Sequence, residues 1–155
     1  MTHFLTQLIS AVIGTVAFAL LFKVRAKYLY LTAIGGGVGY SVYYLFATVI
    51  GASSFIAALI SVIFIAGFSE ISARIVHAPA PVFLLPCLIT IVPGGNLYYA
   101  MKGMISRDIS AAGRYGFEAL KIGLGIAGGI VVVSVIVNLV MGISESRKRR
   151  KNGEK

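Results

Sequence analysis

Five long runs of apolar residues occupy most of this chain, and they limit what it can fold into. They extend from about Phe4 to Phe22, from Tyr28 to Ile50, from Phe55 to Ala73, from Val82 to about Met104, and from about Ala119 to Ile143. A helix needs about 20 apolar residues to cross a bilayer. Only 12% of the residues are charged, and no run alternates as membrane β-strands do. The sequence therefore predicts an all-α, polytopic membrane protein with about five transmembrane helices.

The fourth run is interrupted at Pro93-Gly94-Gly95 and reaches spanning length only when its two halves are counted together. Proline lacks a backbone donor and clashes with the preceding turn, and glycine adopts unwound conformations. Irregular backbone at membrane depth is tolerated where it lines a buried, wet cavity. We therefore predict an unwound segment inside the fourth helix, with Asn96 as the N-cap of a second half-helix over residues 97–101.

The start of that half-helix suits a carboxylate, because its free N–H groups and dipole attract negative charge. The predicted substrate-binding residues are Pro93, Gly94, Gly95, Asn96 and Tyr98, the last as a hydroxyl donor. A proline kink that only shapes the bundle is the alternative, with the tyrosine as an interfacial residue.

Basic residues set the expected orientation. With five crossings and the amino terminus outside, ten of the 14 Lys and Arg residues lie inside, as the positive-inside rule requires. A re-entrant fourth run would instead place the loop of Lys23, Arg25 and Lys27 and the basic tail on opposite sides. We expect a five-helix membrane domain over residues 1–145 and a basic cytoplasmic tail over residues 146–155. The net charge of +9 then indicates contacts with membrane lipids, and no nucleic acid partner is expected.

Glu70 is the acidic residue within an apolar run, and Arg74 follows it four residues later. Residues with this spacing share a helix face, so a structural ion pair near the helix end is one interpretation. The other is a gate or a proton-coupling carboxylate, because ionisable groups in membranes are costly and often mark pathways.

Two pairs of glycines have the spacing of close helix contacts, Gly35 with Gly39 and Gly125 with Gly129. Residues 123–128 also match the dinucleotide pattern G-x-G-x-x-G, but they lie in an apolar helix without a preceding strand. We therefore predict helix packing at both pairs and no cofactor. A flexible hinge at residues 35–37 is an alternative for the first pair.

The sequence contains no catalytic or metal-binding constellation. His3 and His77 are isolated near membrane boundaries, and Cys87 is the single cysteine. No nucleophile, base and acid occur together, so we do not expect an enzyme or a metal site.

The block of residues 69–101 resembles the threonine/serine exporter family, and within it the membrane half that follows a larger hydrolase-like half. The residues that carry the resemblance are Ser69 to Arg74, Ala78 to Phe83, Pro86, Val92 to Gly95, Tyr98 and Met101. Thr90 departs from the pattern, because family members often have a proline shortly before the Val-Pro-Gly.

The resemblance implies export of threonine and serine driven by the proton-motive force, or export of dicarboxylates such as succinate as in some two-chain members. At this length the chain would be the small subunit in a bacterial inner membrane, acting with a larger membrane subunit of the same family. A structural subunit that only stabilises a transporting partner, or a homo-oligomeric channel, is the alternative. The residues alone do not distinguish an amino acid from a dicarboxylate.

Overall fold

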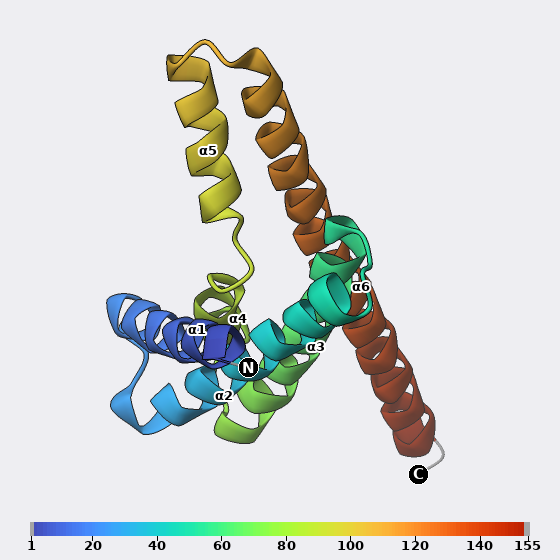
Figure 1. The fold of residues 1–155 in the computed structure, drawn as a ribbon. Coiled ribbons are helices and arrows are strands. Elements are labelled where there is room, and N and C mark those ends of the chain that lie inside the picture. The colour runs from blue at the N-terminus through green and yellow to red at the C-terminus, as the bar shows by residue number, and fades with distance from the viewer. Residues whose placement is uncertain (1, 154–155) are drawn as a thin grey trace.

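The computed structural model describes the backbone of residues 2–153 and the side-chain environments of residues 4–140. The chain forms α1 (Thr2–Leu21), α2 (Leu29–Tyr44), α3 (Ser54–Val76), α4 (Pro81–Leu88), α5 (Gly94–Ile105) and α6 (Ile109–Gly153) (Figure 1). A 3-10 turn, Ala26–Tyr28, precedes α2, and a π-helical turn, Leu45–Val49, follows it. The described residues contain no strand, so the prediction of an all-α fold is confirmed.

Three helices are long and apolar enough to cross a membrane, over Phe4–Leu21, Ser54–Val76 and Ile109–Val140. The second apolar run forms the 16 residues of α2 and the five of the π-helical turn. The fourth is divided between α4, with eight residues, and α5, with 12. The structure thus agrees with an apolar membrane protein, while the number of five crossings stays a prediction.

α3 is the central helix and packs against α2, α4 and α6. Its buried residues Ala58, Val62 and Ile65 form the core together with Cys87 of α4 and Ile122 of α6. Ser53 caps its start by accepting a hydrogen bond from the Ile56 N–H at 3.4 Å.

Glycines allow α6 to lie directly against α3. A Cβ atom at Gly125 would come within 2.6 Å of the Phe55 carbonyl oxygen, and one at Gly129 within 2.9 Å of Val62 Cβ. Both helices therefore advance together along the contact, which makes them parallel. Close approach through small residues is how helices associate in membranes, where no hydrophobic force drives them together.

The other glycine pair brings α2 against α3. A Cβ atom at Gly35 would lie 2.9 Å from Phe68 Cδ1, and one at Gly39 2.5 Å from Ile65 Cδ1. The carbonyl of Gly39 also accepts a 2.6 Å hydrogen bond from the buried Ser61 hydroxyl. α2 continues through residues 35–37 without a break, so these glycines lie in regular helix.

α5 and the first part of α6 form a hairpin that extends away from α1 to α4 (Figure 1). A Cβ atom at Gly103 would lie 2.7 Å from the Ala112 backbone nitrogen, and Tyr99 stacks on Tyr115 with ring centroids 5.2 Å apart. α6 begins at Ile109, earlier than the run expected from Ala119, because these ten residues pair with α5.

Candidate functional site

The interruption of the fourth apolar run lies at residues 89–93, between α4 and α5. Two tight turns carry the backbone across it: the Ile91 N–H donates to the Leu88 carbonyl at 2.9 Å, and the Gly94 N–H donates to the Val92 carbonyl at 2.8 Å. The sequence predicted an interruption inside the fourth run at Pro93-Gly94-Gly95, and the structure contains one that begins at Ile89 and ends at Pro93.

The cap of the second half-helix differs from the prediction. α5 begins at Gly94, and Pro93 is its N-cap, because the Pro93 carbonyl accepts the first helical hydrogen bond from the Leu97 N–H at 3.0 Å. Asn96 as N-cap was therefore wrong, and it lies in the first turn. Gly94 and Gly95 are likewise helical instead of unwound, since the turns upstream already complete the break.

The start of α5 is open to an incoming group. A Cβ atom at Gly94 or Gly95 would have no atom within 4 Å apart from its chain neighbours and the backbone of its own helix. The N–H groups of the first helical turn have no intrahelical acceptor, so those of Gly95 and Asn96 are suited to an anion.

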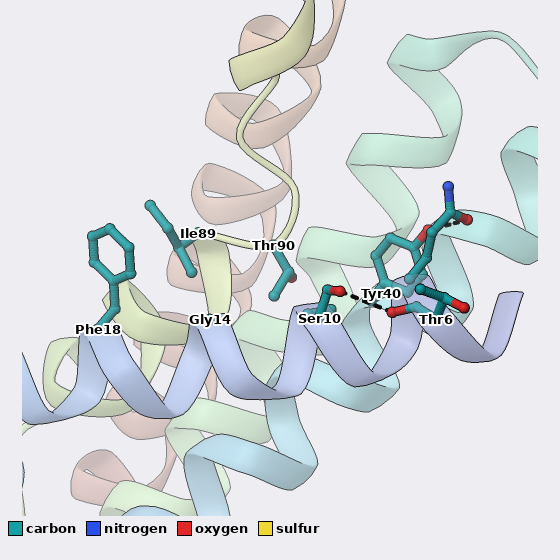
Figure 2. Close-up of a pocket in the computed structure, with 9 residues that line it drawn as sticks. Thr6, Ser10, Gly14, Phe18, Tyr40, Ile89 and Thr90 are labelled. Carbon is teal, nitrogen blue, oxygen red and sulfur yellow. Dashed lines mark hydrogen bonds between the residues drawn. The ribbon is translucent and has the colours of Figure 1, made fainter. Parts of the chain in front are cut away.

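A cavity of about 370 Å³ lies beside the interruption, where α1 passes the end of α4 (Figure 2). We name it the polar pocket. Its lining residues come from α1, from α2 and from the interruption: Thr6, Gln7, Ser10, Ala11, Gly14, Phe18, Tyr40, Ile89 and Thr90. Five of these nine side chains carry a hydroxyl or an amide, and none is charged.

Hydrogen bonds fix the direction in which these polar groups face. The Tyr40 hydroxyl donates to Gln7 Oε1 at 2.9 Å, and the Ser10 hydroxyl donates to the Thr6 carbonyl at 2.9 Å (Figure 2). The Thr90 hydroxyl donates to the Cys87 carbonyl at 2.9 Å. Each of these hydroxyl protons is thus occupied. The oxygens of Tyr40, Ser10 and Thr90 keep lone pairs as acceptors, and Gln7 adds an amide donor.

Residues 7–136 match the family model described as Threonine/Serine exporter, ThrE. The match covers the polar pocket from Gln7 onward, the interruption and most of α6. The chain belongs to the threonine/serine exporter family. Neither the comparison with curated proteins nor the comparison with solved structures gave a match. Family membership and the apolar helices identify a membrane protein with a transport role of the exporter type.

In this exporter-family chain, Tyr98 lies on the exposed side of α5. Its side chain is 62% exposed, and its ring contacts that of Tyr99 edge-on, with centroids 5.3 Å apart. Tyr98 does not line the polar pocket.

Glu70 and Arg74 are also outside the polar pocket. Arg74 Nε lies 4.0 Å from Glu70 Oε2, and their side chains are 53% and 32% exposed, respectively. The pair sits near the end of α3, where an exposed ion pair contributes little stability.

Sequence reasoning missed the contribution of α1. Thr6, Gln7 and Ser10 are polar residues three and four positions apart within an apolar run, so they share one helix face. Polar side chains at membrane depth often indicate a functional site, so this polar face of α1 could have been recognised from the sequence. Tyr40 and Thr90 carried no comparable local pattern, because only the packing of α2 and the interruption against α1 brings them to that face.

No group of three potential metal ligands occurs among the residues that the structure describes. His77 ends α3 in the left-handed conformation, with φ 53°. The side chain of His3 is not among those that the structure describes. Cys87 is a buried core residue.

Proposed function

We propose that this chain is a subunit of a bacterial inner-membrane exporter that carries threonine or serine. The observation that supports it most is the position of the polar pocket beside the interrupted fourth run. Polar side chains at membrane depth have a free-energy cost, so a bundle with only a structural role usually lacks them. Transporters hold their substrates in such polar cavities.

The chemistry of the pocket favours the ammonium end of an amino acid. Hydroxyl oxygens of Tyr40, Ser10 and Thr90 offer acceptors, and an ammonium group has three donors. Gly95 and Asn96 do not line the polar pocket, and the open start of α5 follows its lining residue Thr90 by four residues along the chain. We propose that this start, at Gly95 and Asn96, receives the carboxylate, as free helix N–H groups do.

A dicarboxylate fits this arrangement less well. Its second carboxylate would face acceptor oxygens in the polar pocket. No positively charged residue lines that pocket, and the Gln7 amide is the donor identified above. We therefore favour threonine and serine over succinate.

The directions of the helices support five crossings with the termini on opposite sides. α1 and α2 are antiparallel, since Gln7 contacts Tyr40 while Gly36 faces Thr15. α3 reverses α2, and α6 runs parallel to α3. The α1–α2 connection therefore lies at the end of the bundle toward which α6 runs. We propose that this end, which carries Lys23 and Arg25, is cytoplasmic.

A larger partner subunit of the same family is the remaining part of the proposal. The projecting hairpin of α5 and α6 leaves Met101, Met104 and Ile105 between 63% and 83% exposed. A cavity for alternating access is usually enclosed by two repeats around a midplane site, and this chain supplies one. A purely structural subunit and a homo-oligomeric channel are the competing proposals.

Efflux of labelled substrate tests the function. Cells without endogenous exporters are loaded with labelled threonine, serine or succinate and carry this chain alone or with a candidate larger subunit. We expect efflux of threonine and serine only with both chains. Efflux from this chain alone would favour a channel, and preferential succinate efflux would contradict the proposed pose.

Two pocket variants test the site itself. Thr90→Val and Tyr40→Phe each remove an acceptor for the ammonium, and a hydrogen bond to a charged group contributes about 1.5–3 kcal/mol. We expect initial export rates at low substrate to fall by about 10-fold or more. Tyr30→Phe is the matched control, because Tyr30 is 59% exposed and lines no part of the pocket. Equal rates for all three variants would show that substrate does not bind there.

A further inference from the structure

A second cavity lies at the C-terminal end of α1, shares no lining residue with the polar pocket and has a different chemistry. It has a volume of about 310 Å³ and lies between the connection from α1 to α2 and the connection from α3 to α4. We name it the basic pocket. Lys23, Arg25, Tyr28 and His77 supply its polar lining, and Phe22 and Val82 belong to its apolar lining.

Both connections that form the basic pocket are fixed by backbone hydrogen bonds. Lys23 adopts a left-handed conformation, with φ 56°, and the next N–H, of the buried Val24, donates to the Ala19 carbonyl at 2.9 Å. His77 adopts the same conformation, with φ 53°, and the following Ala78 N–H donates to the Ala73 carbonyl at 3.0 Å. These two helix ends thus have the same defined geometry, which holds the walls in place.

Tyr28 joins the two connections. Its hydroxyl lies 3.5 Å from the Val76 carbonyl oxygen, and its ring meets that of the fully buried Phe83 edge-on, with centroids 6.0 Å apart. The basic pocket is therefore part of the packed structure and not a gap between loose loops.

The charge around the basic pocket has one sign. Lys23 and Arg25 line it, and none of the described lining residues is acidic. Glu70, on the preceding turns of α3, has Arg74 as its ion-pair partner and does not line this cavity. A cavity that is lined by two positively charged side chains, and by no acidic residue among those described, attracts an anionic ligand.

The apolar wall indicates what kind of anion it is. Phe22 and the neighbouring Leu21 are 53% and 74% exposed, so the cationic pocket continues directly into an apolar outer surface of α1. A small soluble anion would gain nothing from that surface, whereas an amphiphile would use both. Basic pockets between membrane helices bind anionic head groups in this way.

We propose that the basic pocket binds the phosphate group of an anionic phospholipid, with the first part of an acyl chain along Phe22. This inference is independent of the exported substrate, because the two pockets share no lining residue. In this proposal the lipid is a specific ligand at this end of the helix bundle. Its phosphate group contacts both the α1–α2 connection and the α3–α4 connection.

Native mass spectrometry of the full chain in mild detergent tests the proposal. The probes are dioleoyl phosphatidylglycerol, dioleoyl phosphatidylcholine and glycerol 3-phosphate, each titrated separately. We expect phosphatidylglycerol to bind at one preferred site and phosphatidylcholine to bind weakly. The double variant Lys23→Gln/Arg25→Gln should bind phosphatidylglycerol about 25-fold more weakly, because each basic residue that lines the pocket and faces the anionic head group contributes about fivefold.

The matched control removes two positive charges elsewhere. Lys27 lies over the Tyr28 ring, with Nζ 4.8 Å from its centroid, and does not line the basic pocket, and Lys102 lies in α5. The double variant Lys27→Gln/Lys102→Gln should keep the affinity of the unaltered chain. Equal losses in both double variants, or equal binding of phosphatidylcholine, would overturn the site. Binding of glycerol 3-phosphate as tight as that of phosphatidylglycerol would overturn the lipid as its ligand.

Discussion

Gly125→Ala is the perturbation that tests the central packing of the fold. The added Cβ atom would lie 2.6 Å from the Phe55 carbonyl oxygen, which is 0.8 Å less than the 3.4 Å where ordinary contact begins. It would also lie 2.9 Å from Ala58 Cβ and 3.1 Å from the Leu59 backbone nitrogen. Two of these three atoms belong to the α3 backbone, so no side-chain rotation relieves the clash. α3 and α6 must move apart.

The size of the effect follows from that separation. A gap of 0.5–1 Å already loses roughly a quarter to a half of the dispersion energy of each contact, and overpacking a core usually costs about 1–3 kcal/mol. Replacing glycine by alanine in a helix has an opposite effect of about 0.5–1 kcal/mol through backbone entropy. Gly123→Ala isolates that second contribution. Gly123 lies on the same helix as Gly125, and a Cβ atom there would have no atom within 4 Å apart from its chain neighbours and the backbone of its own helix. The free energy of unfolding should therefore be about 1–3 kcal/mol lower for Gly125→Ala than for Gly123→Ala.

Cys87 provides the assay. It is the single cysteine of the chain and is fully buried beside α2 and α3, so a thiol-reactive maleimide dye reports loss of the core. Purified protein in mild detergent would be unfolded by heat or by sodium dodecyl sulfate, and dye fluorescence recorded. Gly123→Ala should unfold at the same point as the unaltered chain or later, and Gly125→Ala earlier. An unfolding midpoint of Gly125→Ala equal to or above that of Gly123→Ala would refute the close α3–α6 contact.

Two further predictions concern single polar contacts and use the same dye assay. Ser61→Ala removes the buried 2.6 Å hydrogen bond to the Gly39 carbonyl and should lower the free energy of unfolding by about 1 kcal/mol, and an unchanged midpoint would contradict that bond. Glu70→Gln should change it by less than about 1 kcal/mol, because the pair with Arg74 is partly exposed at 4.0 Å. Export should also persist in Glu70→Gln, since Glu70 lies outside the polar pocket, and loss of export with normal assembly would instead indicate proton coupling.

The predicted apolar runs and the observed helices agree well, because the length and apolarity of a membrane helix are local properties of the chain. Glycine spacing likewise indicated close contacts at Gly35 and Gly125, where a Cβ atom has no room. The position of the helix cap at the interruption of the fourth run was predicted less accurately. Pro93 accepts the first hydrogen bond of α5, and a choice between Pro93 and Asn96 as cap depends on backbone angles that composition does not specify.

Three properties can be predicted from the residues alone: the chain is helical, it is apolar enough for a membrane, and its fourth run is interrupted. All three follow from backbone hydrogen bonding and proline chemistry within a few neighbouring residues. Which side chains meet at the interruption depends instead on how the helices pack. Gln7, Tyr40 and Thr90 come from three segments far apart in the chain and line one cavity because α1 packs against α2 and the end of α4. A contact of that kind depends on which helix faces are buried together, and no local pattern in the sequence contains that information.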